Sequence, residues 1–235
     1  MSRVTLDITD GIALLAMTRP EKRNALDAAM MDGLTVALRE AEATARVLIL
    51  SGEGSVFCAG ADLDAVAEMS TEAQFRNHAE RLGGLFATLA DLAIPTISVV
   101  TGAAIGAGCG LVCASDLAIT APGAHLGFPE FAKGLLPALV IPPLVAAIGQ
   151  RRAMHAICAE DLLSAEEARH LGIVTQVCNE PARAAQALAR HLSRVSPESL
   201  GAAKSLLWTA ATGPISDARR HAIEANVAAR CKPHG

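Results

Sequence analysis

Two segments of this 235-residue chain combine a strand pattern, a glycine-rich turn and the start of a helix. In the first, residues 47–49 lead into residues 52–63, and in the second, residues 96–100 lead into residues 102–111. Small residues let a ligand approach the backbone closely, and the start of a helix leaves peptide N–H groups unpaired. Two such turns can direct one N–H each at a single oxygen, an arrangement that stabilises a developing oxyanion. The pair therefore indicates an enzyme rather than a generic globular domain.

Composition limits the class of protein. The chain is 51% hydrophobic and only 3% aromatic, with a formal net charge of −4, no tyrosine and one tryptophan. It therefore lacks both the basic surface and the stacking aromatics of nucleic-acid-binding proteins. No stretch approaches the roughly 20 apolar residues that a membrane span needs, and the first residues lack the apolar core of a signal peptide. We expect a cytoplasmic protein that binds no nucleic acid and no membrane.

Motifs for metal ions and nucleotide cofactors are also missing from the sequence. It contains no Gly-x-Gly-x-x-Gly fingerprint, no P-loop, no Gly-x-Ser-x-Gly elbow and no His-Glu-x-x-His pair. The cysteines are scattered without a Cys-x-x-Cys spacing, which favours reduced thiols packed as small hydrophobic side chains. We expect no bound metal and no resident cofactor.

The order of strand and helix signals predicts an α/β core over residues 1–180 and a helical tail over residues 181–235. Strand patterns lie at residues 4–8, 12–17, 47–50, 97–100, 117–120 and 173–177, and helical patterns lie at residues 27–43, 71–92, 108–114, 164–171, 181–192, 197–211 and 215–229. Several faces of the tail are rich in alanine and leucine. Such faces must pack on the core or on a neighbouring subunit, so we expect a homo-oligomer.

Five motifs, in this order, resemble those of the crotonase, or enoyl-CoA hydratase/isomerase, superfamily. They are RPEKRNAL at residues 19–26, FCAGADL at 57–63, GAAIGAGCGL with SDLA at 102–118, LGFPE at 126–130 and LSAEEARHLGIVTQV at 163–177. The resemblance covers about residues 4–177. It implies an α/β spiral of ββα repeats whose C-terminal helices assemble the chain into a homotrimer or a dimer of trimers. It also implies a CoA thioester as the substrate, so that coenzyme A arrives with the substrate.

The resemblance implies a role for three residues in the chemistry. The thioester oxygen would lie between the backbone N–H groups of Ala61 and Ala107, and Glu130 would be the catalytic acid. Because Glu130 lies between the apolar residues Phe128 and Phe131, its carboxyl is expected to be partly desolvated, which raises a carboxyl pKa toward a usable range.

The resemblance also implies how CoA is held. The phosphates would contact two basic side chains, and the pantetheine and adenine would lie along nearby backbone. The residues concerned are Lys22 and Arg23 for the phosphates, and Ala25, Ala59 and Leu63 for the backbone contacts. Asp62 fits a CoA contact and a helix-start acid equally well.

The chain departs from the best-known family pattern at one position. Well-studied hydratases carry a second glutamate at the position of Gly110, so a mechanism with two glutamates is not expected here. Three functions stay open: hydration of a 2-enoyl-CoA, double-bond isomerisation by Glu130 alone, and acyl-CoA binding without catalysis. Residues 134–143 resemble a branch that handles branched or carboxylated enoyl-CoAs, and for this reason we favour hydration.

Overall fold

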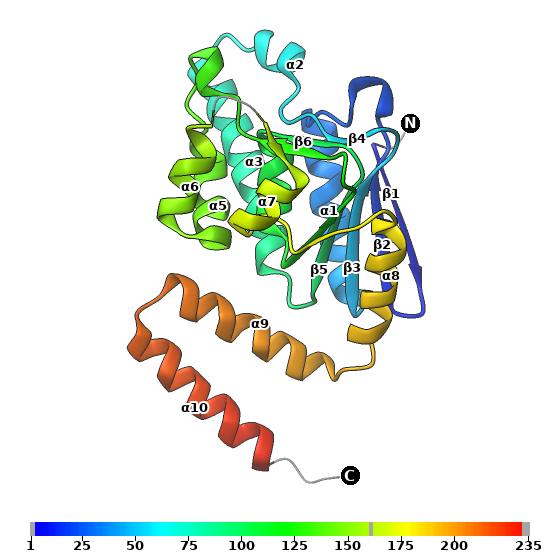
Figure 1. Cartoon of the computed structure of the whole chain (residues 1–235), viewed down its shortest axis with the longest axis vertical. Helices are drawn as coiled ribbons and strands as arrows, with labels where there is room; N and C mark the ends of the chain where they lie inside the picture. Colours follow the sequence, from blue (N-terminus) through cyan, green and yellow to red (C-terminus); the bar gives the residue numbers. More distant parts are fainter. Residues whose placement is uncertain (1–2, 160–161, 232–235) are drawn as a thin grey trace.

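The computed structural model describes residues 3–159 and 162–231, and Figure 1 shows an α/β body with a helical arm. A six-stranded sheet has the strand order β1-β2-β3-β5-β7-β10. Its strands are β1 (Val4–Thr9), β2 (Ile12–Met17), β3 (Val47–Gly52), β5 (Thr96–Val100), β7 (Leu117–Thr120) and β10 (Gln176–Val177). Among the described strand pairs of this sheet, β1–β2 is antiparallel and the others are parallel. Strands β1 and β2 form a tight hairpin, because Asp10 and Gly11 make a two-residue turn with positive φ.

A second, four-stranded sheet corrects the prediction for the two glycine-rich segments. Its strands are β4 (Val56–Cys58), β6 (Ala103–Ile105), β8 (His125–Gly127) and β9 (Leu163–Ser164). Strands β4 and β6 lie inside the predicted turns, and each is only three residues long, too short to show an alternating pattern. Each segment is therefore a strand, a second strand and a helix. The repeated ββα units that the resemblance implies are confirmed.

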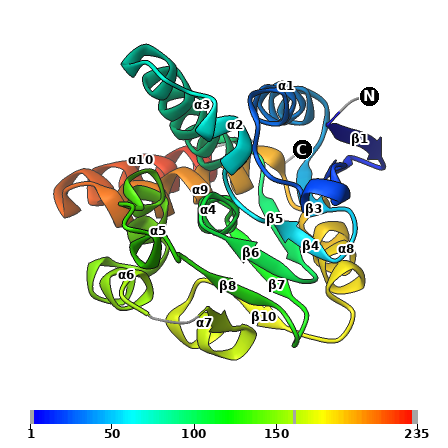
Figure 2. The same cartoon turned by 90° about the horizontal axis from the view of Figure 1, so that it is seen from above.

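Most predicted helices form within a few residues of their expected bounds. Helix α1 (Ala28–Thr44) buries the six residues that share its apolar face, and α3 (Glu72–Asp91) begins with a capping box of Thr71 and Gln74. The remaining short helices are α2 (Leu63–Ala67), α4 (Ala107–Ala114), α5 (Ile141–Ile148), α6 (Gln150–Ile157) and α7 (Ala165–Leu171), with 3-10 turns η1 (Pro20–Lys22), η2 (Phe131–Lys133) and η3 (Ala138–Val140). Every residue of α4 is buried, and Figure 2 shows this helix near the centre of the molecule.

The strand predicted at residues 173–177 is shorter than expected. The N–H groups of Ile173 and Val174 both donate to the Ala168 carbonyl, where they close the end of α7. They are therefore not available to a sheet, and only Gln176–Val177 pair with β7.

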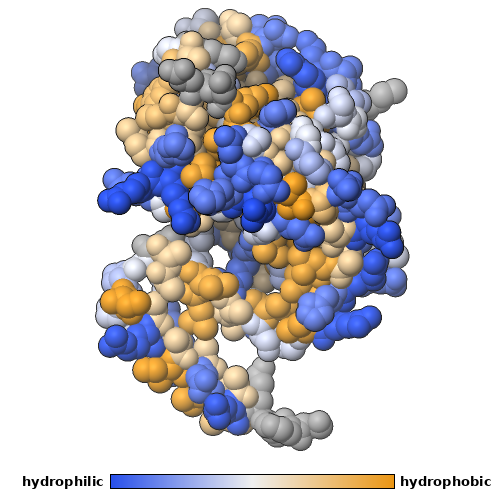
Figure 3. All heavy atoms as spheres, viewed as in Figure 1, coloured by the Kyte–Doolittle hydropathy of each residue, from blue (hydrophilic) through white to orange (hydrophobic). Residues whose placement is uncertain are grey.

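The three C-terminal helices differ in how they pack. Helix α8 (Pro181–Leu192) places Ala185 and Ala189 in an apolar cluster on the six-stranded sheet. Helices α9 (Pro197–Thr212) and α10 (Ile215–Cys231) form the arm at the bottom of Figure 1, where Figure 3 shows apolar side chains at the surface. In the part of the chain that the structure describes, no helix is long and apolar enough to cross a membrane. The division at residue 180 stays a prediction.

Candidate active site

The first glycine-rich segment orients the N–H of Ala61 away from Leu26. Ala61 forms a parallel bridge with Leu26, in which the Leu26 N–H donates to the Gly60 carbonyl (2.8 Å) and the Asp62 N–H donates to the Leu26 carbonyl (3.1 Å). Because the residues on either side of Ala61 make these bonds, the Ala61 N–H lies on the opposite side of the strand. It has no acceptor among the residues of 3–159 and 162–231.

The second segment places another N–H, with no acceptor among the described residues, at the start of a buried helix. Gly106 adopts φ 53° and ψ −118°, a conformation that glycine accepts readily, and α4 begins at Ala107. The first N–H groups of a helix have no intrahelical acceptor. Ala107 is itself buried, so its N–H is sheltered from bulk water.

The two segments can touch because a glycine without a side chain stands on one side of each contact. A Cβ built on Gly60 would lie 2.7 Å from the Ile105 carbonyl oxygen and 3.4 Å from the Ala107 nitrogen. A Cβ on Gly108 would lie 2.3 Å from the Cys58 carbonyl oxygen. The structure therefore brings together the two segments that carry the Ala61 and Ala107 N–H groups.

Glu130 lies beside this junction. It follows β8, and its Oε1 lies 2.6 Å from the place that a Cβ on Gly106 would occupy. Its Oε2 is buried, so the carboxylate points inward. Phe128 is buried, as expected, but Phe131 is 48% exposed, so of these two apolar neighbours only Phe128 belongs to the core.

The position of the missing second carboxylate is filled by apolar side chains. A Cβ on Gly110 would lie 2.6 Å from Cζ of Phe86 on α3 and 3.0 Å from Cγ1 of Val140 on η3. Phe86 is buried, and so is its neighbour Leu85, in line with a core position. Phe75 and Leu136, by contrast, have exposed side chains and are not core residues.

The residues predicted to hold CoA lie on adjacent segments. Lys22 on η1 donates a hydrogen bond to Asp64 on α2 (2.8 Å), and this bond raises the Lys22 pKa. The Ala59 N–H donates to the Arg23 carbonyl (3.0 Å), which joins the same two segments. Arg23 and Leu63 are exposed, Ala59 is half-buried and Ala25 is buried. Their contacts with CoA stay a prediction.

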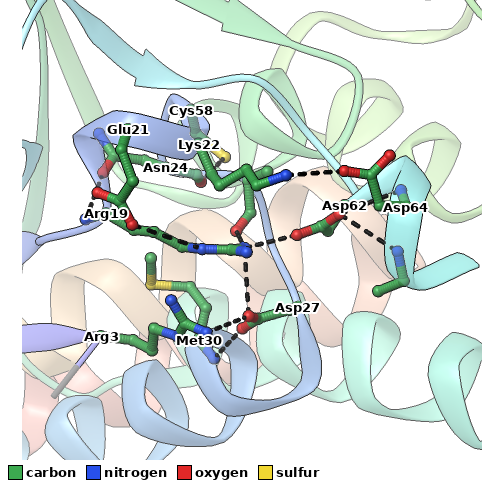
Figure 4. Close-up of polar contacts among 12 residues, drawn as sticks. Arg3, Arg19, Glu21, Lys22, Asn24, Asp27, Met30, Cys58, Asp62 and Asp64 are labelled. Carbon is green, nitrogen blue, oxygen red and sulfur yellow. Dashed lines mark hydrogen bonds and ion pairs between the residues drawn. The ribbon is translucent and has the colours of Figure 1, made fainter. Parts of the chain in front are cut away.

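A buried arginine, which the sequence patterns did not single out, links these segments (Figure 4). Arg19 is only 8% exposed, and its Nη1 lies 2.6 Å from Oδ2 of Asp62 and 3.2 Å from Oδ2 of Asp27. The same Nη1 donates to the Ala25 carbonyl (3.3 Å). The available signal was a charged residue two positions after the strand at residues 12–17.

Asp62 is therefore held within the protein. Its Oδ1 accepts from the N–H groups of Asp64 and Ala65, so it is the N-cap of α2. Burial acts to raise the Asp62 pKa, but the hydrogen bond from Arg19 and those from the backbone outweigh it, and the pKa lies below its usual value. The helix-start interpretation describes its geometry, and a contact with CoA stays a prediction.

The thiol within the first glycine-rich segment is structural. Cys58 donates to the Asn24 carbonyl and accepts from the Gly60 N–H, and burial raises its pKa to about 12. A thiol with that pKa is protonated at neutral pH, so it is no nucleophile. Asn24 holds the same loop through bonds to the Arg19 N–H and the Glu53 and Val56 carbonyls.

Comparison with known proteins gives one consistent family. The family model described as enoyl-CoA hydratase/isomerase matches residues 7–231. A Thermus thermophilus protein provisionally named an enoyl-CoA hydratase is 35% identical over 223 residues, which cover 92% of this chain and 87% of that protein. The 2,3-dehydroadipyl-CoA hydratase of Escherichia coli is 31% identical over 212 residues, covering 88% and 82%. The crystal structure of an enoyl-CoA hydratase from Shewanella pealeana matches with a TM-score of 0.91 at 30% identity, covering 98% of this chain and 89% of that one. The chain therefore belongs to the enoyl-CoA hydratase/isomerase family of enzymes and has the crotonase fold.

Proposed function

We propose that the chain adds water to the double bond of a 2-enoyl-CoA thioester, with Glu130 as the acid and base. One observation carries the proposal: the Glu130 carboxylate lies against Gly106, directly before the Ala107 N–H, where the two glycine-rich segments meet. A thioester oxygen bound to the Ala61 and Ala107 N–H groups would present the adjacent carbons to this carboxylate.

The proposed reaction balances with one carboxylate. Glu130 takes a proton from water as the water oxygen bonds to C3, and the double-bond electrons move to the thioester oxygen. The resulting enolate oxygen carries the charge, which the two N–H groups stabilise, and one such donor is typically worth on the order of 10²–10³ in rate. Glu130 then returns the proton to C2. The reaction requires no cofactor beyond the CoA of the substrate.

A panel of 2-enoyl-CoAs of different chain length tests this proposal. We expect the purified protein to convert at least one of them, seen as loss of the conjugated thioester absorbance. Glu130→Gln keeps the size of the side chain and should lower kcat about 100-fold or more. Glu166→Gln, which changes an exposed glutamate paired with Arg169, is the matched control. Full activity of the Glu130 variant would exclude it as the acid and base.

Double-bond isomerisation is the second candidate, favoured by the apolar filling at Gly110. With Phe86 and Val140 in that space, a second carboxylate that orients water has no place there. Glu130 would take a proton from C2 of a 3-enoyl-CoA and return it to C4, with the enolate held in the same way. Conversion of 3-enoyl-CoAs, with no turnover of 2-enoyl-CoAs, would assign this function. Binding of CoA thioesters without any turnover would assign a non-catalytic role.

We also infer that the arm is covered by other copies of the chain in a homotrimer. Its exposed apolar side chains support this, with Leu207 73% exposed and Ile215 71% exposed. Contiguous apolar surface of this kind is rare on monomers. Light scattering coupled to size-exclusion chromatography should give three or six times the mass of the chain, and a monomer mass would contradict the inference. The cytoplasmic location stays a prediction.

A further inference from the structure

We propose that Arg19 is a positioning residue that orients and polarises the N–H of Ala61 through two peptide groups. The inference rests on the proposed function, in which that N–H holds the thioester oxygen. Arg19 lies on the far side of the 19–26 segment from the site, so it acts through the backbone between them. Its test therefore measures the thioester carbonyl itself.

The path consists of hydrogen bonds that run in one direction. Arg19 Nη1 donates to the Ala25 carbonyl (3.3 Å), and the N–H on the other end of that peptide group belongs to Leu26. The Leu26 N–H donates to the Gly60 carbonyl (2.8 Å), and the N–H on the other end of that peptide belongs to Ala61. A positive charge at one end of such a series of hydrogen bonds polarises each bond, by about 10–30% per bond. The Ala61 N–H is the last donor in this series of hydrogen bonds.

The peptide between Gly60 and Ala61 needs to be held from outside. Gly60 has φ +94°, a region that glycine enters freely, so its own conformational preference does not fix the orientation of this peptide. Three contacts on either side of it do so: the Leu26 N–H on the Gly60 carbonyl, the Asp62 N–H on the Leu26 carbonyl, and the Arg19–Asp62 ion pair at 2.6 Å. Asp62 is also the N-cap of α2, so the ion pair fixes the start of that helix as well.

Stability alone is a weak reason for this arginine. A buried ion pair often contributes no more than apolar residues of the same volume, because both charges lose their hydration. Among the residues that the structure describes, Arg19 Nε is buried without a hydrogen bond, and it lies 4.0 Å from Oε1 of Glu21. The site therefore keeps a charge whose solvation is incomplete. A charge retained under these conditions is better explained by its orienting effect on the neighbouring peptides.

Infrared spectroscopy of a bound thioester is the test. The probe is butyryl-CoA labelled with ¹³C at the thioester carbonyl, which is saturated and is not hydrated. In the wild-type protein we expect the carbonyl band to shift to lower frequency on binding. Arg19→Met should remove about half of that shift or more and lower kcat about 10- to 100-fold, with the Kd for butyryl-CoA changed less than about threefold.

Controls separate positioning from folding. Arg81→Met breaks another ion pair between two segments, with Asp32, and should keep the full shift and the full kcat. Arg19→Lys keeps the charge, but an ammonium lacks the planar fork of donors, so its shift should fall between those of the wild type and Arg19→Met. This variant decides the matter if Arg19→Met does not fold.

The outcomes are distinct. A folded Arg19→Met protein, or failing that an Arg19→Lys protein, with the full wild-type shift would overturn the role of Arg19 and leave the proposed function intact. A wild-type protein that binds butyryl-CoA with no shift would overturn the oxyanion site, and the role of Arg19 with it.

Discussion

Adding one methyl group at Gly108 should separate the two segments that carry the proposed oxyanion donors. The Cβ of Gly108→Ala would lie 2.3 Å from the Cys58 carbonyl oxygen and 2.8 Å from the Cys58 Cβ. An ordinary contact requires β4 and α4 to move apart by about 1 Å, because the opposing group is backbone and cannot rotate away. Alanine gains about 1 kcal/mol over glycine inside a helix, whereas overpacking a core costs about 1–3 kcal/mol. We expect a net destabilisation of about 0–2 kcal/mol.

The effect on catalysis should be larger than the effect on stability. A displacement of about 1 Å in an active site can cost about 100-fold in rate, so kcat of Gly108→Ala should fall by that factor. Gly84→Ala is the matched control, because Gly84 is an exposed residue inside α3 with nothing within 4 Å of its Cβ position. It should raise the free energy of unfolding by up to about 1 kcal/mol and leave kcat unchanged. Urea denaturation and steady-state kinetics measure both quantities. Wild-type kcat in folded Gly108→Ala would refute the close approach of the two segments as the basis of the site.

Three further predictions concern stability and the arm. Because the folded pKa of Asp62 lies below its unfolded value of about 3.9, Asp62 stabilises the protein above that pH and less as the pH falls through the folded pKa. Asp62→Asn should therefore cost about 1–3 kcal/mol at pH 6 and less at pH 3, and a cost that grows toward acid in urea denaturation would contradict this. Gly110→Ala should destabilise the protein, and a second substitution, Phe86→Leu, should reduce that loss of stability. A double-mutant cycle of the unfolding free energies should give a favourable coupling of about 0.5–3 kcal/mol, and zero coupling would contradict the contact. Lys204→Met removes the 2.9 Å ion pair to Asp116 between α9 and the body, so hydrogen exchange in α9 should quicken about tenfold while β5 is unchanged.

The sequence predicts the elements whose cause is local. The helices predicted at residues 27–43, 71–92 and 181–192 are confirmed as α1, α3 and α8. The apolar face of α1, the capping box of α3 and the proline at the start of α8 each depend on residues within a few positions of one another. Strands β4 and β6 were missed because three residues carry no readable period, and they form only when the two strands pair with each other. The strand predicted at residues 173–177 is shortened by another contact, because the N–H groups of Ile173 and Val174 donate to the Ala168 carbonyl at the end of α7.

The same distinction between local and distant causes applies to the candidate site. Ala61, Ala107 and Glu130 were identified from motifs, and the structure places the segments that bear them in contact. Arg19 was missed because its significance lies in contacts with Asp27, Ala25 and Asp62, the last of them 43 residues away. The apolar filling at Gly110 was likewise invisible, since Phe86 and Val140 come from separate elements. No pattern along the chain reveals which distant side chain occupies the space beside a glycine.

The central claim is that two backbone N–H groups and one carboxylate act on a single thioester. A crystal structure of the protein with an acyl-CoA bound tests it most directly, through the distances from the thioester oxygen to the nitrogens of Ala61 and Ala107. We predict both distances at about 2.7–3.1 Å, with the Glu130 carboxylate on the side of the acyl carbons next to the carbonyl. A thioester oxygen that is bonded to neither nitrogen, or that lies on the far side of α4 from Glu130, would contradict the account.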